Sequence, residues 1–242
     1  MQGFAADAPA VAHTFVDALD DDLVVAGDDG HHLARVRRLR LGETVTAADG
    51  KGVWRPYVVS DTGSGRVGLH ACGAAVVEPG LAPGLAVAFA LTKGTKPDLV
   101  VQKLTELGSD RILPVRSRRS TARWERDRSA AAVERLRRVA REAAAQCRRA
   151  LLPEIGEPAP LESLAGRPGL LVADRGGWAA SDLVEPPDDG WVLVIGPEGG
   201  LTSSEQAALG SPPALGVGPY VLRAETAAIA GAAALAGRRR PR

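Results

Sequence analysis

A glycine-rich loop, Gly196-Pro197-Glu198-Gly199-Gly200, follows directly on the apolar run Val192–Ile195. Glycines allow a backbone to approach a ligand closely. The loop lacks the lysine and hydroxyl residue of a phosphate loop, and it lacks the GxGxxG spacing of a dinucleotide site. From its residues alone, it is either a ligand-binding loop for an unidentified ligand or an ordinary turn between a strand and a helix.

Two further segments place charged residues where a ligand could bind. Val221–Ala227 follows Gly218-Pro219 and opens the last expected helix, although Glu225 and Thr226 also suit a helix N-terminus without a ligand. Three of the chain's four lysines gather between Leu91 and Gly108. Ammonium groups at a strand end can bind an anion, or they can belong to a solvated helix.

Arginine is concentrated in one stretch of the chain. Residues 111–149 hold thirteen arginines and four acidic residues, a net charge of +9 in a protein whose overall charge is +1. A second basic run spans Arg35–Arg40. Clustered arginine is typical of proteins that bind nucleic-acid phosphates, and it also occurs on solvated helices.

The secondary structure expected from the sequence, which must position these segments, changes near residue 79. Before it, short β-prone runs alternate with turn residues, which indicates a small barrel or sandwich with one helix near His31–Leu39. Beyond the linker Pro79–Gly84, buried strands such as Leu85–Leu91 and Trp191–Ile195 alternate with helices. This pattern predicts an α/β domain with a mostly parallel sheet, in which ligands bind at the carboxyl ends of strands.

The sequence does not indicate a metal-binding, membrane-spanning or secreted protein. Two separated cysteines and four scattered histidines give no metal-ligand spacing, so we expect no metal. No apolar run is long enough to span a bilayer and no targeting signal is seen, so we expect a cytoplasmic protein without membrane contact. The tail Arg238–Arg242 is expected to be disordered.

Together, and in this order, the motifs resemble the ribosomal RNA small subunit methyltransferase E family, which methylates N3 of a uridine in 16S rRNA. The resemblance rests on the GPEGG loop, LRxETA at Leu222–Ala227, KGxK…QKxTELG at Lys93–Gly108, and His32–Gly42 with Asp49-Gly50. It covers nearly the whole chain. Departures are Ala224 within LRxETA, Ala145 where the family often has Glu, and Thr14-Phe15 in place of an aromatic pair.

The resemblance implies a fold and its partners. An α/β domain of the SPOUT type, with a trefoil-knotted parallel sheet, follows a small PUA-like β-barrel. The implied domains are an RNA-binding barrel at 1–78 and a knotted methyltransferase domain at 79–242. The implied cofactor is S-adenosylmethionine, and the implied partners are 16S rRNA in the small ribosomal subunit and a second copy in a homodimer.

The resemblance also implies roles for particular residues. The cofactor-binding residues are Val172, Ala173, Ile195, Gly196, Pro197, Gly199, Gly200, Gly218, Val221, Leu222 and Thr226. The RNA-binding residues are Arg35, Arg38, Arg40, Lys93, Lys96, Lys103 and Arg149. Glu198 and Glu225 are the candidate proton acceptors, and Arg223 is the candidate for stabilising the uracil anion.

Two alternatives stay open on the sequence. A related knotted enzyme could methylate a ribose 2′-hydroxyl or another base. A non-catalytic RNA-binding assembly factor could keep the fold, but the intact GPEGG and LRxETA segments argue against it.

Overall fold

The chain packs as two compact units, Met1–Gly80 with Ala144–Leu152, and Leu81–Ala143 with Pro153–Arg242. The computed structural model describes residues 10–63, 65–92, 94–120, 126–186 and 190–242, with the side chains of 126–128 left aside. The sequence predicted a single boundary between residues 78 and 79. The observed division at Gly80 lies close to this predicted boundary. The segment Ala144–Leu152 also belongs to the first unit, and a prediction with one boundary could not include it.

The N-terminal unit is built on one six-stranded sheet. Its strands are β1 (Ala12–Phe15), β2 (Asp22–Val25), β3 (Thr44–Ala48), β4 (Val53–Gly63), β5 (Arg66–Ala71) and β6 (Val76–Val77). They run in the order β1-β3-β4-β5-β2, with β6 beside β4, and only the β1–β3 pair is parallel. The expected helix begins earlier than the sequence indicated, as α1 (Gly27–His31) continuing into the π-helical turn His32–Val36.

The segment Ala144–Leu152 closes one side of this unit. Ala144 and Ala150 are buried together with Phe15 and Ala48. Main-chain bonds join Leu152 N–H to the Gly50 carbonyl at 3.0 Å and Gly52 N–H to the Ala150 carbonyl at 3.3 Å. The end of a long helix is therefore part of the core of the N-terminal unit.

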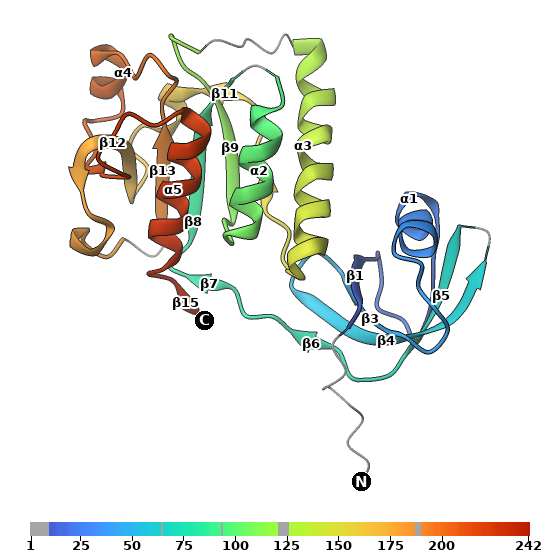
Figure 1. The fold of residues 1–242 in the computed structure, drawn as a ribbon. Helices are drawn as coiled ribbons and strands as arrows, with labels where there is room; N and C mark the ends of the chain where they lie inside the picture. Colours follow the sequence, from blue (N-terminus) through green and yellow to red (C-terminus); the bar gives the residue numbers. More distant parts are fainter. Residues whose placement is uncertain (1–9, 64, 93, 121–125, 187–189) are drawn as a thin grey trace. The chain divides into compact units, whose positions relative to one another are not determined.

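The C-terminal unit is an α/β layer structure (Figure 1). The strands are β8 (Leu85–Ala90), β9 (Arg111–Arg116), β10 (Glu154–Ile155), β11 (Ala159–Pro160), β12 (Leu170–Trp178), β13 (Trp191–Ile195) and β14 (Ala214–Leu215). The helices are α2 (Lys96–Glu106), α3 (Arg126–Cys147), α4 (Ser203–Ala208) and α5 (Ala224–Ala236), with the 3₁₀ turns Leu161–Leu164 and Ala180–Asp182. The strands lie in the order β10-β9-β8-β13-β12-β14, with β11 beside β9, and every pairing among them is parallel.

Alternate residues of the central strands point to opposite faces of this sheet. On one face, Leu85, Val87 and Phe89 pack with side chains of α2, α3 and α5. On the other face, Ala86 and Ala88 pack with the turn Leu161–Leu164 and the end of α4. The predicted parallel sheet is confirmed, with both faces covered as its continuous apolar strands require. Among the described residues, no helix is long and apolar enough to cross a membrane.

The tail was expected to be disordered, and that expectation is wrong. β15 (Arg240–Pro241) pairs antiparallel with β7 (Leu81–Ala82), which lies within the predicted linker. Arg239 is 4% exposed and donates to the carbonyls of Pro83, Gly108 and Leu81 at 2.7, 2.5 and 3.2 Å. It also pairs with Asp110, whose carboxylate accepts from the Leu85 N–H at 2.8 Å. Three main-chain carbonyls and a carboxylate therefore hold this end of the chain.

Candidate active site

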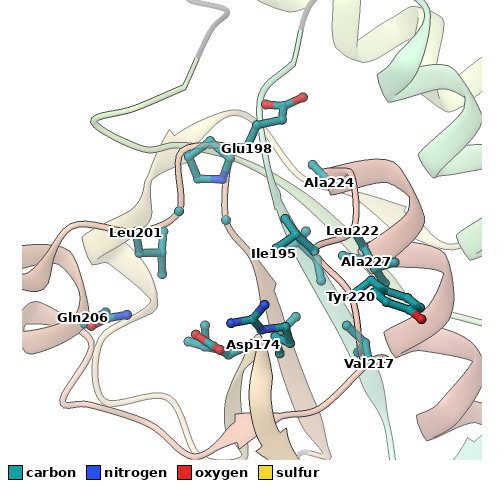
Figure 2. Close-up of a pocket in the computed structure, with 17 residues that line it drawn as sticks. Asp174, Ile195, Glu198, Leu201, Gln206, Val217, Tyr220, Leu222, Ala224 and Ala227 are labelled. Atoms are coloured by element: carbon teal, nitrogen blue, oxygen red, sulfur yellow. The ribbon is translucent and has the colours of Figure 1, made fainter.

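A cavity of about 300 Å³ opens at the carboxyl ends of β12 and β13 (Figure 2). Eight of the expected cofactor-binding residues line it: Val172, Ala173, Ile195, Gly196, Pro197, Gly200, Val221 and Leu222. Eight other lining residues were not among the expected cofactor-binding residues: Asp174, Arg175, Leu201, Gln206, Val217, Tyr220, Ala224 and Ala227. Glu198, a candidate proton acceptor, also lies in the wall. The cavity thus gathers the GPEGG loop, the start of LRxETA and the polar continuation of β12.

Three expected cofactor residues do not line this cavity. The Gly199 carbonyl accepts from Arg119 at 2.6 Å, and a Cβ built on Gly199 would lie 3.3 Å from the Arg119 side chain. Thr226 is exposed in the first turn of α5. Gly218, with φ +146°, shapes the chain just before the lining residues Tyr220 and Val221.

The GPEGG loop is a tight turn followed by a capped helix. Gly200 N–H donates to the Pro197 carbonyl at 2.8 Å, and Gly200 has φ +69°, a backbone conformation that favours glycine. Thr202 caps α4, and its side chain exchanges hydrogen bonds with Glu205. Thr202 with Glu205 three residues on is the sequence pattern of a capping box, and both of its hydrogen bonds are present.

Glu205 also anchors a second loop beside the cavity. Its carboxylate accepts from Arg118 N–H at 2.7 Å as well as from Thr202. Burial alone would raise the pKa of Glu205, but the N–H groups of Thr202 and Arg118 and the Thr202 and Ser117 hydroxyls lower it to about 2. Glu205 is therefore ionised, and it ties the chain after β9 to α4.

The three catalytic candidates occupy the rim on the side of α2 and α5. Lys96, expected to bind RNA, instead contacts two of them: its Nζ lies 3.0 Å from Glu198 Oε1 and 3.4 Å from Glu225 Oε2. Arg223 is exposed at the start of α5. The Glu198 backbone N–H, the Lys96 ammonium and the charge of Arg223 hold the pKa of Glu198 below its ordinary value.

The expected RNA-binding residues fall into different settings. In the N-terminal unit, Arg35 and Arg38 line a hollow of about 310 Å³ with Thr62, Gly63 and Gly65, while Arg40 is exposed outside it. Arg149 belongs to the same unit. Lys103 donates to both Glu106 oxygens, at 2.9 and 2.8 Å. Lys93 lies outside the described residues.

One strand beside the cavity, β12, pairs with β14 at two separate places. Leu215 of β14 pairs with Ala173 near the middle of β12 and again with Trp178 at its end. Gly177 makes this close passage feasible, because a Cβ there would lie 2.5 Å from the Leu215 carbonyl carbon. The segment Asp174–Gly177 thus bulges out of the pairing with β14, and Asp174 and Arg175 line the cavity.

Comparison with known proteins agrees with this architecture. The model of the RNA methyltransferase domain family matches residues 81–236, and that of the RNA methyltransferase PUA domain matches residues 25–68. The ribosomal RNA small subunit methyltransferase E of Mycobacterium bovis is 35% identical over 88% of this chain and 87% of its own length. The Bacillus subtilis protein of the same name is 26% identical over 84% and 85%.

Solved structures share the fold. A ribosomal RNA small subunit methyltransferase E from Neisseria gonorrhoeae, solved bound to S-adenosyl methionine, has a TM-score of 0.82 at 24% identity over 92% of this chain and 96% of its own. A methyltransferase from Legionella pneumophila in complex with the same cofactor has a TM-score of 0.83 at 24% identity, over 93% and 97%. On the family model and the mycobacterial relative, this chain belongs to the ribosomal RNA small subunit methyltransferase E family.

Proposed function

We propose that this protein uses S-adenosylmethionine to methylate N3 of a uridine in the 16S rRNA of the small ribosomal subunit. The observation that carries the proposal is the cavity bounded by the GPEGG loop, the residues before α5 and the end of β12. It lies at the carboxyl ends of parallel strands, where α/β sheets bind their ligands. Ribosomal RNA as a substrate implies the cytoplasm.

The residues that line the cavity fit this cofactor. Apolar side chains such as Val172, Ile195 and Leu222 offer contacts for an adenine ring. Asp174 and Arg175 bring opposite charges to the same wall, which matches the ammonium and carboxylate of the methionine end. The Gly196 and Gly200 backbone leaves room for close approach.

Two architectural features belong to the same proposal. A trefoil-knotted path of the chain in the C-terminal unit is proposed because the family resemblance implies it. A homodimer is proposed from family membership, with each active site near the subunit interface.

The chemistry divides between the cofactor and the protein. When bound, the cofactor supplies a methyl group already activated as a sulfonium. The protein must hold an unpaired or flipped uracil in line with that methyl group, and alignment alone is worth roughly 7–11 kcal/mol at best. Arg223, which is exposed and follows the lining residue Leu222, is the group we propose to stabilise the uracil anion that forms as N3 loses its proton.

The two carboxylates are not equal candidates for the proton acceptor. The pKa of Glu198 is lowered by its own backbone N–H and by Lys96, so this carboxylate is a weaker base than an ordinary one. The Glu225 side chain is only 12% exposed, and its Oε2 makes no hydrogen bond among the described residues. We therefore favour Glu225 over Glu198 as the proton acceptor.

The RNA-binding proposal is revised by the lysine contacts. Arg35 and Arg38 share one hollow, and together with Arg40 and Arg149 they remain the proposed phosphate contacts. Lys96 and Lys103 hold carboxylates of their own chain, so we no longer count them among these contacts.

The proposal is tested by transfer of a labelled methyl group to unmodified small ribosomal subunits. Glu225→Gln and Arg223→Ala are each expected to lower kcat at least about 100-fold, the size usual for a proton acceptor or an anion donor. Turnover is measured at saturating cofactor, and the cofactor affinity of Arg223→Ala, measured by calorimetry, is expected to stay within about three-fold of wild type. Full activity in both variants removes these roles, and absence of cofactor binding by the wild-type protein removes the proposed function.

A further inference from the structure

Lys96 stands between two carboxylates that come from distant parts of the chain. Its ammonium donates a hydrogen bond to Glu198 at 3.0 Å and lies 3.4 Å from Glu225. Lys96 begins α2, Glu198 lies in the loop after β13, and Glu225 lies in the first turn of α5. One side chain therefore joins three segments that are more than a hundred residues apart at their extremes.

The two carboxylates belong to different segments at the cavity: Glu198 lines it, and Glu225 is next to the lining residue Ala224. Glu198 is in the wall formed by the GPEGG loop, and Figure 2 shows its carboxylate directed away from the Asp174 end of the cavity. Glu225 directly follows Ala224, which with Tyr220 belongs to the other wall. A single cation that holds both carboxylates connects one wall to the other.

The contacts of Lys96 lie at an exposed part of the cavity rim. Glu198 and Lys96 are each more than one-third exposed, and Tyr220 and Val221 are 78% and 81% exposed. The loop before α5 thus presents large apolar side chains to solvent. The contacts of Lys96 with Glu198 and Glu225 are suited to holding the GPEGG loop and the start of α5 at a fixed separation.

We propose that Lys96 is a positioning residue for the cofactor: its paired contacts with Glu198 and Glu225 form an ionic clasp that sets the width of the cofactor cavity. This inference rests on the proposed function, since it takes S-adenosylmethionine as the occupant. It assigns Lys96 no contact with the RNA and no proton transfer. Breaking the clasp separates the walls and weakens binding of the cofactor and of its demethylated product alike.

The clasp has an electrostatic signature. Exposed ion pairs are screened by salt, so cofactor affinity is expected to fall as ionic strength rises. The Glu198 hydrogen bond raises the pKa of Lys96, so the ammonium stays charged above the ordinary lysine range. Protonation of Glu198 at low pH opens the clasp, which places the loss of affinity on the acid side.

The test is calorimetric titration of S-adenosylmethionine and S-adenosylhomocysteine into the full chain. Lys96→Met is expected to raise both Kd values about five- to ten-fold, whereas Lys96→Arg, which keeps the charge, stays within about two-fold of wild type. The matched control is Lys103→Met, because Lys103 pairs with Glu106 on the same helix and spans no cavity wall. Its Kd for both ligands is expected to equal that of wild type.

A second set of variants keeps the inference testable if Lys96→Met perturbs the fold. Glu198→Gln with Glu225→Gln removes both pairs and leaves the 37% exposed Lys96 ammonium to be solvated by water, and it should weaken cofactor binding to a similar extent. Adding Lys96→Met to that double variant should then change Kd by less than two-fold.

The possible outcomes distinguish a failure of the ionic clasp from a failure of the proposed function. Unchanged Kd values in Lys96→Met, or an equal loss in Lys103→Met, overturn the clasp and leave the proposed function standing. Failure of the wild-type protein to bind S-adenosylmethionine overturns the proposed function itself. A loss of RNA affinity in Lys96→Met with intact cofactor binding restores Lys96 to the phosphate contacts and also overturns the clasp.

Discussion

Cations meet carboxylates at both ends of the parallel sheet in the C-terminal unit, but in different surroundings. At the amino ends of the strands, the Arg239 side chain is fully buried beside Asp110 and three main-chain carbonyls. At the carboxyl ends, Lys96 is 37% exposed between Glu198 and Glu225. The enclosed Arg239 pair is expected to contribute to stability, whereas exposed ion pairs contribute little to folding, and for the Lys96 pairs we have proposed a role in ligand binding instead.

The largest effect is expected at the buried end. Arg239→Met leaves the carbonyls of Leu81, Pro83 and Gly108 without their donor, and it should lower the free energy of unfolding by about 3 kcal/mol. Chemical denaturation measures this value. Arg240→Met, at an exposed neighbouring position, is the control and should cost less than about 0.5 kcal/mol. An equal cost in both variants removes the contrast between the buried and exposed ends.

A buried carboxylate, that of Glu205, lies on the cavity side of the sheet. Like the buried Arg239, it is expected to contribute to stability. Glu205→Gln replaces an oxygen acceptor by an amide and should lower the free energy of unfolding by about 2–3 kcal/mol at pH 7. Because the folded pKa of about 2 lies below the ordinary 4.5, this contribution is present above pH 4.5 and is lost as pH falls toward 2.

Unfolding experiments at pH 7 and pH 3.5 measure this pH dependence. The difference between wild type and Glu205→Gln should narrow at the lower pH. Glu154→Gln, at an exposed position, serves as the control. A difference that stays constant with pH contradicts an ionised, hydrogen-bonded Glu205.

The next effect concerns the ligand rather than the fold. Arg175→Ala should weaken S-adenosylmethionine binding about ten-fold, or about 1.4 kcal/mol, because the proposed partner of Arg175 is the cofactor carboxylate. Calorimetry with 5′-methylthioadenosine, which lacks the amino-acid end, provides the control. An equal loss for both ligands shows that Arg175 does not contact that end.

The smallest effect is expected in the N-terminal unit. Arg35→Ala with Arg38→Ala should weaken 16S rRNA binding about five-fold and reduce the slope of log affinity against log salt by about 2. Cofactor affinity should not change. Filter binding over a salt series measures both quantities, with Lys51→Ala as the control. An unchanged slope would exclude the hollow as a phosphate site.

The sequence allowed much of this architecture to be predicted, because continuous apolar strands and capped helices are local signals. The parallel sheet, α2, α5 and the Thr202 capping box follow from such signals. β1 was missed, since its four buried residues include His13 and Thr14 and do not read as an apolar run. The buried tail was missed because the partners of Arg239 are carbonyls distant in the sequence.

The segments that form the candidate site could be predicted, but the side-chain contacts between them could not. The family resemblance implied the cofactor-binding residues, and eight of them line the cavity. Asp174 and Arg175 were not named because β12 continues beyond its apolar residues, although the Asp-Arg-Gly-Gly run directly after those apolar residues was an available signal. No pattern along the chain could reveal that Lys96 meets Glu198 and Glu225, since these contacts depend on tertiary packing.

The central claim, methylation of a uridine N3 in 16S rRNA, is tested most directly by locating the methyl group. Unmodified small ribosomal subunits are incubated with the protein and labelled S-adenosylmethionine, and the 16S rRNA is digested and mapped by mass spectrometry. The account predicts one labelled nucleotide, a uridine carrying the methyl group on its base at N3. A methyl group on a ribose or on another base, or no transfer to the RNA, would contradict it.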